Sequence, residues 1–315
     1  MLKMMKMMLN SSQVSHFTLD AYLDPGLFKY VIFLTVLCFY VFIIVANVLL
    51  IVVICMNRSL HEPMYLFLCS LFVNELYGST GLFPLLLLHI LSDVHSVSAP
   101  FCFLQNVCLY SYGGGEYLIL AIMSYDRYLA ICRPLQYSTH MTGNRIAALI
   151  AFAWLCPLLL CVVMTSLSAT LRLCGNVINK VYCDNYSIVK LSCGATTVNN
   201  IYGLFITCCS IFLPLALIFV SYAKILRICF SGCKQTRQKA VSTCSPHLAS
   251  LLNFSCGAFF EIMQSRFNMN NIPNMMRIFL SLYWLTCQPL LNPLVYGLNL
   301  SKMRVICKSL ISAEM

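Results

Sequence analysis

The sequence predicts an all-α membrane protein, a bundle of seven transmembrane helices, and two observations support this prediction. Of the 315 residues, 60% are hydrophobic and only 10% are charged, whereas about 25% are charged in an ordinary soluble domain. The apolar residues also lie in long continuous blocks and not in the periodic stripes of a soluble amphipathic helix. Both features indicate one domain that is embedded in a bilayer.

Seven blocks are long enough to cross the hydrocarbon core, which takes about 20 apolar residues. The expected spans are 30–55, 64–90, 99–125, 146–169, 201–223, 240–264 and 278–300. The second, third and sixth blocks contain Glu75, Glu116 and Glu261, and carboxylates within spans usually face the interior of a bundle. The predicted organisation is therefore an N-terminal segment 1–29, a membrane domain 30–300 and a short tail 301–315.

The positions of the positive charges predict the orientation. Of the 20 Lys and Arg residues, 12 lie on the side that carries the C-terminus and crowd the helix ends there. The positive-inside rule then makes the C-terminus cytoplasmic and the N-terminus extracellular. Sequons at Asn10 and Asn185 would both face the glycosylating lumen in this orientation, so both are candidate glycosylation sites.

Other functional classes find little support in the sequence. The net charge of +10 is spread over short connections, which predicts orientation signals and no nucleic-acid partner. Residues 1–13 have no continuous apolar core, so we expect the first span to serve as an uncleaved insertion signal. The chain has no HExxH, GxSxG or P-loop motif, and His61, His89 and His95 lack ligand spacing. We therefore expect neither an enzyme nor a metal or other cofactor.

Four motifs occur in order along the spans. The third span ends in MSYDRYLAICRPLQY (123–137), the sixth begins with KAVSTCSPHL (239–248), and the seventh contains PLLNPLVY (289–296). PMY (63–65) opens the second span, and Asn47 lies in the first. Together these motifs resemble those of odorant receptors, a branch of the rhodopsin-like G-protein-coupled receptors. Glu75, the stretch 81–84 and the Asn-rich connection before the seventh span are similar to features of fish members.

The resemblance implies a two-state switch at the cytoplasmic end. Asp126 would hold Arg127 in the resting state, and activation would release Arg127 toward Tyr222 and Tyr296 as the sixth helix moves outward. The residues implied in coupling are Asp126, Arg127, Tyr128, Tyr222, Lys239, Asn292, Pro293 and Tyr296. The alternative reading of Arg127 is a side chain that only snorkels to the interface. The implied partner is a heterotrimeric G protein of the stimulatory olfactory type, with cyclic AMP as the next product.

The chain has 19 cysteines, most of them inside apolar blocks, where cysteine behaves as a small hydrophobe. Four others, Cys102, Cys174, Cys183 and Cys193, lie on the external side and allow three pairings. The resemblance selects Cys102 with Cys183 and Cys174 with Cys193, and the alternative is free thiols. Cys307, just past the seventh span, is a candidate for palmitoylation.

Glu75 and Glu116 lie at mid-membrane depth on neighbouring spans. Two unpaired carboxylates are expensive there, so we expect them to share a proton or a cation. The resemblance places Glu75 close to the sodium site of related receptors. Asn47 and Asn292 are expected nearby.

Small-molecule sites are mostly apolar with a few directed polar groups. By analogy with the family, the odorant pocket is expected to be lined by Tyr110, Gly113, Gly114, Ile206, Thr207, Ser210, Ala258, Ile262 and Leu285. Three consecutive glycines, 113–115, serve either close helix packing or ligand space. Glu261 either meets a cationic ligand or pairs with Arg266, and the internal pair is the expectation.

The chain departs from the family pattern in the sixth span. Ser255 stands where the family usually has tyrosine, which puts the activation route inside the bundle in doubt, and Pro246 replaces a more usual serine and could kink the helix early. The leading interpretation is an odorant receptor in the plasma membrane of olfactory cilia, surrounded by lipid. The alternatives are a rhodopsin-like receptor for an internal ligand and, more remotely, a channel or transporter. Many transporters contain related halves, and no internal repeat is found.

Overall fold

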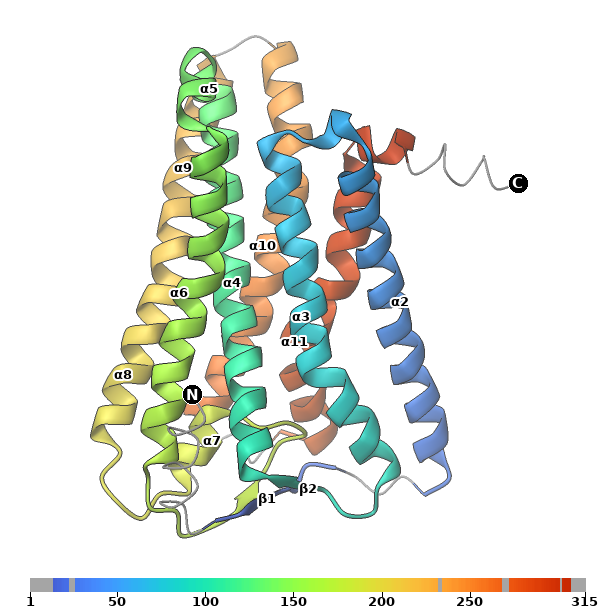
Figure 1. Cartoon of the computed structure of the whole chain (residues 1–315), viewed down its shortest axis with the longest axis vertical. Helices are drawn as coiled ribbons and strands as arrows, with labels where there is room; N and C mark the ends of the chain where they lie inside the picture. Colours follow the sequence, from blue (N-terminus) through green and yellow to red (C-terminus); the bar gives the residue numbers. More distant parts are fainter. Residues whose placement is uncertain (1–13, 23–25, 232–233, 268–271, 301, 307–315) are drawn as a thin grey trace.

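The computed structural model describes residues 14–22, 26–231, 234–267, 272–300 and 302–306, and it describes side-chain surroundings for these except at 230–243 and 298–299. Within this part of the chain, long helical rods run alongside one another (Figure 1). Their bounds are α2 Phe28–Met56, α3 Pro63–Leu91, α4 Ala99–Cys132, α6 Gly143–Ala169, α8 Thr197–Thr207 continued through a π-helical turn Cys208–Phe212 into α9 Leu213–Ser231, α10 Lys234–Arg266 and α11 Asn274–Asn299.

Each of the seven predicted spans overlaps one of these rods, and the rods mostly extend beyond the predicted ends; the seventh span was predicted to residue 300, one residue past the end of α11. The fifth shows the largest difference, because α8 begins at Thr197 and α9 ends at Ser231. In the third, α4 continues from Tyr125 to Cys132 and carries Asp126 and Arg127 on its last turns. Among the described residues, five helices are long and apolar enough to cross a membrane by composition: α2, α3, α6, α8 with α9, and α11. The remaining two rods, α4 and α10, contain more polar residues along their length.

Helix α4 lies at the centre of the bundle, packed against α3, α6, α9 and α10. Its buried positions lie all around the helix and include polar residues such as Asn106 and Glu116. The peripheral helix α2, in contrast, exposes large apolar side chains, among them Phe39 and Val45. Such an arrangement suits a bilayer, in which apolar surface can face lipid while polar groups gather inside.

One end of the bundle, here called the sheet end, is closed by a three-stranded sheet that the sequence did not predict. The central strand β1 (His16–Leu19) pairs antiparallel with β2 (Ser96–Ser98) and parallel with β3 (Val177–Ile178). Side chains alternate along a strand, and Phe17 and Leu19 are accordingly both fully buried beneath the sheet. The described part of the N-terminal segment is therefore a structural cover of the bundle.

The opposite end carries the short helix α5 (Tyr137–His140) and is called the α5 end (Figure 1). The three-residue turns Arg58–Leu60 and Pro134–Gln136 also lie in connections. Helix α10 runs unbroken through Pro246, and α11 runs unbroken through Pro289 and Pro293. None of these prolines ends its helix, although each removes one backbone hydrogen bond.

Candidate functional site: an inner cavity and a polar switch

A cavity of about 150 Å³, here called the inner cavity, lies among α4, α6, α8, α10 and α11 and beneath the short helix α7 (Asn185–Lys190). Eight of the nine residues expected in a ligand pocket line it: Tyr110, Gly113, Gly114, Ile206, Thr207, Ser210, Ala258 and Ile262. A cavity of about this size binds benzene in an engineered protein. The inner cavity therefore suits a small molecule.

The prediction for Leu285 was wrong. Its side chain is buried in the main apolar core with 1% of its surface exposed, and the neighbouring Trp284 lines the cavity instead. Successive side chains of a helix point about 100° apart. A prediction that is wrong by one residue therefore names a side chain on a different face of the helix. Trp284 packs near Phe254 and Tyr112, and Phe254 packs in turn near Tyr117, in an aromatic cluster that borders the cavity.

The sequence left open whether the glycine run 113–115 serves close helix packing or provides ligand space, and the structure supports both. A Cβ atom on Gly113 would lie 3.1 Å from Cζ3 of Trp284, and one on Gly114 would lie 2.8 Å from Cβ of Pro157. Helices α4, α6 and α11 can approach this closely only because these side chains are absent. Gly113 and Gly114 also line the cavity, so close packing and ligand space come from the same residues.

The expected pairing of Glu261 with Arg266 was also wrong. The amine of Lys180, in the loop 170–196, forms an ion pair with Glu261 and lies 3.8 Å from a carboxylate oxygen of Asp184. Arg266 instead lies over the ring of Tyr186 at 4.8 Å. Sequence spacing along α10 favoured the local pair, whereas the folded loop brings a distant lysine onto the same carboxylate.

Burial favours a neutral amine at Lys180, but the carboxylates of Asp184 and Glu261 outweigh that effect and raise its pKa. Lys180 therefore carries its positive charge in the folded protein. The ion pair fastens the loop to the end of α10, at the wall of the inner cavity.

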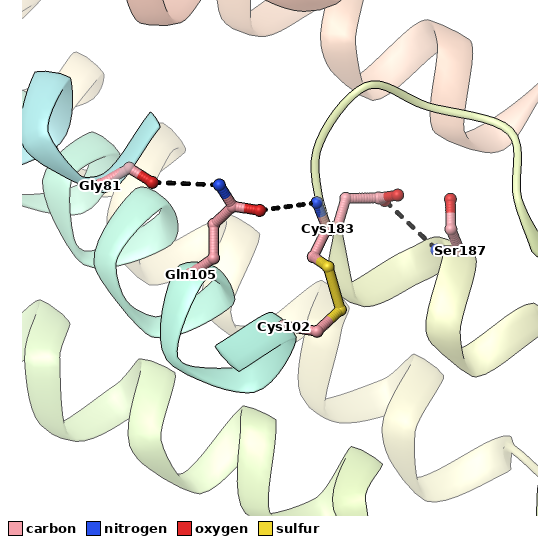
Figure 2. The surroundings of a disulfide bond; sticks show 6 residues. Gly81, Cys102, Gln105, Cys183 and Ser187 are labelled. Carbon is pink, nitrogen blue, oxygen red and sulfur yellow. Dashed lines mark hydrogen bonds between the residues drawn. A yellow bond between two sulfur atoms is a disulfide. The ribbon is translucent and has the colours of Figure 1, made fainter. Parts of the chain in front are cut away.

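Two disulfide bonds are present at the sheet end, between Cys102 and Cys183 and between Cys174 and Cys193. In the first, the Cα atoms are 5.4 Å apart, within the usual range. Figure 2 shows a second connection beside it, because the side-chain oxygen of Gln105 accepts a hydrogen bond from the Cys183 amide while its nitrogen donates to the Gly81 carbonyl, at 2.9 and 3.0 Å. Helices α3 and α4 thus hold the loop over the cavity.

The structure argues against a glycan at Asn185. This asparagine is buried, and its side-chain oxygen accepts a hydrogen bond of 2.7 Å from Ser168. Asp184 accepts a hydrogen bond from the Ser187 amide and caps the helix that begins at Asn185. A glycan is bulky and needs surface, so the Asn185 side chain is better explained as a buried contact that joins α7 to Ser168 of α6. Asn10 and Cys307 lie outside the described residues.

Glu75 and Glu116 lie in one hydrogen-bond network at the middle of the bundle. The side-chain nitrogen of Asn292 lies 2.5 Å from Glu75 and 3.1 Å from Glu116. Tyr112 donates to Glu75 at 3.0 Å, and Asn74 donates to Glu116 at 3.1 Å. The hydrogen-bond partners that the described residues supply to the two carboxylates are neutral hydroxyl and amide groups. The two buried carboxyl groups therefore have no cationic side chain hydrogen-bonded to them in the described structure.

Asn47 lies close to this region but serves a different purpose. Its side-chain nitrogen donates to the carbonyl oxygens of Ile43 and Pro289, at 2.8 and 3.0 Å. In a helix the Pro289 carbonyl would accept from residue 293, and Pro293 has no amide hydrogen. Asn47 thus satisfies a carbonyl that Pro293 leaves without its helical donor.

At the α5 end, Asp126 and Arg127 are paired. Two nitrogens of Arg127 donate to one carboxylate oxygen of Asp126, at 3.1 and 2.5 Å, and the hydroxyl of Tyr137 donates to the other oxygen at 2.7 Å. Asp126 is fully buried. Tyr128 packs beneath cations, with Lys224 lying 5.2 Å and Arg133 lying 6.0 Å from its ring centroid.

The other coupling residues are placed on α9, α10 and α11. The hydroxyl of Tyr222 lies 2.6 Å from Nδ1 of His247, whose other ring nitrogen lies 2.9 Å from the Leu120 carbonyl oxygen. The hydroxyl of Tyr296 is buried and has no hydrogen-bond partner among the described residues. Lys239 lies in α10, and its side chain is outside the description.

Comparison with known proteins connects this arrangement to a family. The sequence profile described as olfactory receptor matches residues 36–313. Olfactory receptor 52B2 of Homo sapiens is 35% identical over 289 residues, which cover 89% of this chain and 88% of that protein. The chain belongs to the olfactory receptor family. Olfactory receptor 6E1 of Mus musculus is 32% identical over 309 residues, 97% of each chain.

The fold of this olfactory receptor is also that of a solved structure. The crystal structure of squid rhodopsin aligns with a TM-score of 0.72 over 90% of this chain and 85% of that chain, at 19% identity. That likeness shows a rhodopsin-like seven-helix fold. Family and fold together make the protein a membrane-spanning signalling receptor of the odorant type and not an enzyme.

Several residues near the cavity or the switch of this olfactory receptor had no role predicted from the sequence. Lys180 and Trp284 are two of them, and His247 was quoted within a motif without a function. For Trp284 the residue type itself was a signal, because a tryptophan in an apolar span needs a hydrogen-bond partner for its indole N–H when it is buried. In the structure the Tyr182 hydroxyl lies 3.3 Å from that nitrogen. For Lys180 no local sequence signal exists, since its partner Glu261 is 81 residues away along the chain.

Proposed function

We propose that this olfactory receptor binds a small odorant in the inner cavity and thereby activates a stimulatory G protein of the olfactory type, so that cyclic AMP rises. One observation supports the proposal most directly. Helix α10 contributes Ala258 and Ile262 to the cavity wall, and His247, about three turns along the same helix, joins it to α4 and α9. A ligand that changes the position of α10 at the cavity therefore acts on the switch region.

The lining of the cavity indicates the kind of ligand. Apolar and aromatic side chains such as Ile206, Ile262 and Trp284 form much of the wall, and its small polar groups include the side chains of Thr207, Ser210 and Asn200. The charged side chains of Glu261 and Arg266 also line it, and they contact Lys180 and Tyr186 respectively. Sites of this composition bind apolar ligands and orient them through a few polar contacts. We infer a compact odorant with an apolar body and at least one hydrogen-bonding group.

The sheet end is proposed to face the outside of the cell, with the C-terminus in the cytoplasm. The disulfides lie at the sheet end, and disulfides persist in oxidising compartments. Lys and Arg residues are concentrated toward the other end, as the positive-inside rule requires. Residues 1–29 and 301–315 then flank the membrane domain, and the cilia of olfactory neurons are the proposed location.

The proposed switch follows from the pairing at the α5 end. In the resting state Arg127 is held by Asp126. Activation would release it toward Tyr222 and Tyr296 as α10 moves outward, which opens a cleft for the G protein. A ligand drives such a change only by binding the active state more tightly than the resting state. Glu75 and Glu116 are proposed to share one proton or one sodium ion, which would couple the middle of the bundle to the same equilibrium.

The test is cyclic AMP in cells that display the receptor, challenged with panels of amino acids, amines, bile acids and volatile odorants. We expect a response that is lost in Arg127→Ala and in Ala258→Trp, which fills the inner cavity. The matched control is Phe259→Trp, next to Ala258 but 58% exposed on the bundle surface. A response that survives both Arg127→Ala and Ala258→Trp, with display unchanged, would contradict the proposal.

A further inference from the structure

A second cavity, of about 360 Å³, lies at the sheet end between α2, α3 and α11. It shares no lining residue with the inner cavity, whose volume is about 150 Å³. Small-molecule sites usually have volumes of about 300 to 1,000 Å³. By volume, this second cavity is the more typical ligand site of the two.

The walls of the second cavity are apolar on three sides. The residues that form them are Ile32 and Val36 of α2, Leu86 and Ile90 of α3, and Met275, Ile278 and Leu282 of α11. Ala21 and Tyr22 of the N-terminal segment contribute to the lining together with Val181. Ile32 and Met275 remain 39% and 66% exposed, so this apolar space adjoins the surface of the bundle that faces lipid.

Two histidines, His89 and His95, belong to the polar part of the wall. The rings of His89 and His95 lie 5.8 Å apart between centroids, and Tyr22 stacks on His95 at 4.5 Å. Tyr22 uses its hydroxyl to donate to the Val181 carbonyl at 2.8 Å. In contrast, Nδ1 of each histidine is buried without a hydrogen-bond partner among the described residues. Buried polar atoms are normally paired, so these imidazoles have hydrogen-bonding capacity that the described protein does not use.

The charged groups of the wall favour a neutral ligand. Lys29 and Asp93 are the charged side chains that line the cavity in the described structure, and they pair with each other at 3.1 Å. The wall thus has no net charge with which to neutralise a carboxylate or an ammonium group. A hydroxyl is neutral and can both donate to one imidazole nitrogen and accept from another.

We propose that the second cavity binds a neutral amphipathic alcohol, with its hydroxyl at His89 and His95 and its apolar body between α2, α3 and α11. The alcohol could come from the bilayer, as a sterol, or from outside, as a free long-chain alcohol. Because the site is separate from the inner cavity, its occupancy does not depend on whether an odorant binds there or whether a G protein couples.

The experiment uses the purified full-length receptor in sterol-free lipid nanodiscs and a decan-1-ol that carries a diazirine. Saturable cross-linking to peptides from α2, the His89–His95 region and α11 is the expected result. Competition by cholesterol assigns the site to a bilayer sterol, whereas competition by decan-1-ol alone assigns it to a free long-chain alcohol. Labelling that does not saturate, or a decanoic acid probe that labels the same peptides at lower concentration than the alcohol, overturns the proposal.

Variants locate the site within the receptor. Leu282→Trp fills the cavity and should abolish labelling, and Val36→Trp does the same from another helix. His89→Phe should raise the half-saturating concentration by about tenfold, the usual effect of one lost hydrogen bond of about 1.4 kcal/mol, while His89→Gln keeps a hydrogen-bonding group and should label like the parent. Ala258→Trp in the inner cavity is the control, with surface display measured throughout. Unchanged labelling in both Leu282→Trp and Val36→Trp contradicts the proposal.

Discussion

The hydroxyl of Tyr222 on α9 lies 2.6 Å from Nδ1 of His247 on α10, and Nε2 of the same ring lies 2.9 Å from the carbonyl oxygen of Leu120 on α4. A carbonyl can only accept, so Nε2 carries the proton and Nδ1 accepts from the tyrosine. One buried imidazole therefore connects three helices at the end of the bundle where coupling is proposed.

Replacing His247 by leucine should raise basal cyclic AMP, because α10 loses the two hydrogen bonds that the His247 ring makes to α4 and α9. Each such bond contributes about 1 kcal/mol, so the resting state should lose about 1 to 2 kcal/mol. The measurement is cyclic AMP without ligand, normalised to surface display. His140→Leu is the control, since His140 is a partly buried histidine at the same end whose ring lies 2.9 Å from the Gln136 carbonyl oxygen in its own connection. Normal display of His247→Leu with unchanged basal signal would show that this connection does not restrain the resting state.

Tyr296→Phe should leave surface display unchanged and reduce the ligand-evoked response. The Tyr296 hydroxyl is buried without a hydrogen-bond partner among the described residues, so the resting state loses no bond when it is removed. In the proposed active state the hydroxyl meets Arg127, and losing a hydrogen bond to a charged group costs about 1.5 to 3 kcal/mol. Dose–response curves for cyclic AMP measure the effect. An unchanged maximum and midpoint would exclude Tyr296 from the switch.

Glu116→Gln should abolish any sensitivity of signalling to sodium and alter basal cyclic AMP. Glutamine keeps the shape of the side chain and removes its charge, so the pair with Glu75 no longer needs a shared proton or cation. The measurement is cyclic AMP in sodium-containing medium and in medium with N-methylglucamine. The exposed carboxylate of Asp93 provides a control variant, Asp93→Asn. If display, basal signalling and sodium sensitivity all stay at the parent level, the shared proton or cation should be abandoned.

The membrane architecture could be predicted from sequence because it depends on local composition, and all seven spans were placed. The pocket residues were expected from the family resemblance, and eight of the nine line the inner cavity. What could not be predicted depends on contacts between distant segments. The strand His16–Leu19 finds its partners only after the bundle has formed, and Glu261 meets Lys180 only when the loop folds back over α10.

Ionisation of Lys180 should not make stability depend on pH in the physiological range. The pKa of Lys180 is raised in the folded state by Asp184 and Glu261. A raised pKa contributes stability that is fully present below the unfolded value, about 10.4, and is lost only as pH rises through the higher folded value. Lys180 itself thus contributes equally at pH 5.5 and at pH 8. In Lys180→Met, however, the carboxyl groups of Asp184 and Glu261 lose their cation, and an unpaired buried carboxyl group costs less at low pH, where it can take up a proton. The difference in melting temperature between the parent and Lys180→Met should therefore be larger at pH 8 than at pH 5.5. A difference that shrinks across this interval would mean that Lys180 is not the charged partner.

Lys180→Met should destabilise the receptor more than Glu261→Gln, and the double variant should recover part of the loss. Lys180 and Glu261 expose only 10% and 13% of their side chains, and removing one partner of a buried ion pair costs about 3 to 5 kcal/mol because the other charge is left unpaired. Lys180→Met leaves both Asp184 and Glu261 without their cation, whereas Glu261→Gln still leaves Lys180 beside Asp184 at 3.8 Å. Melting temperatures of the detergent-solubilised variants, compared in a double-mutant cycle, measure the coupling. Additive losses in the cycle would show that the pair does not fasten the loop to α10.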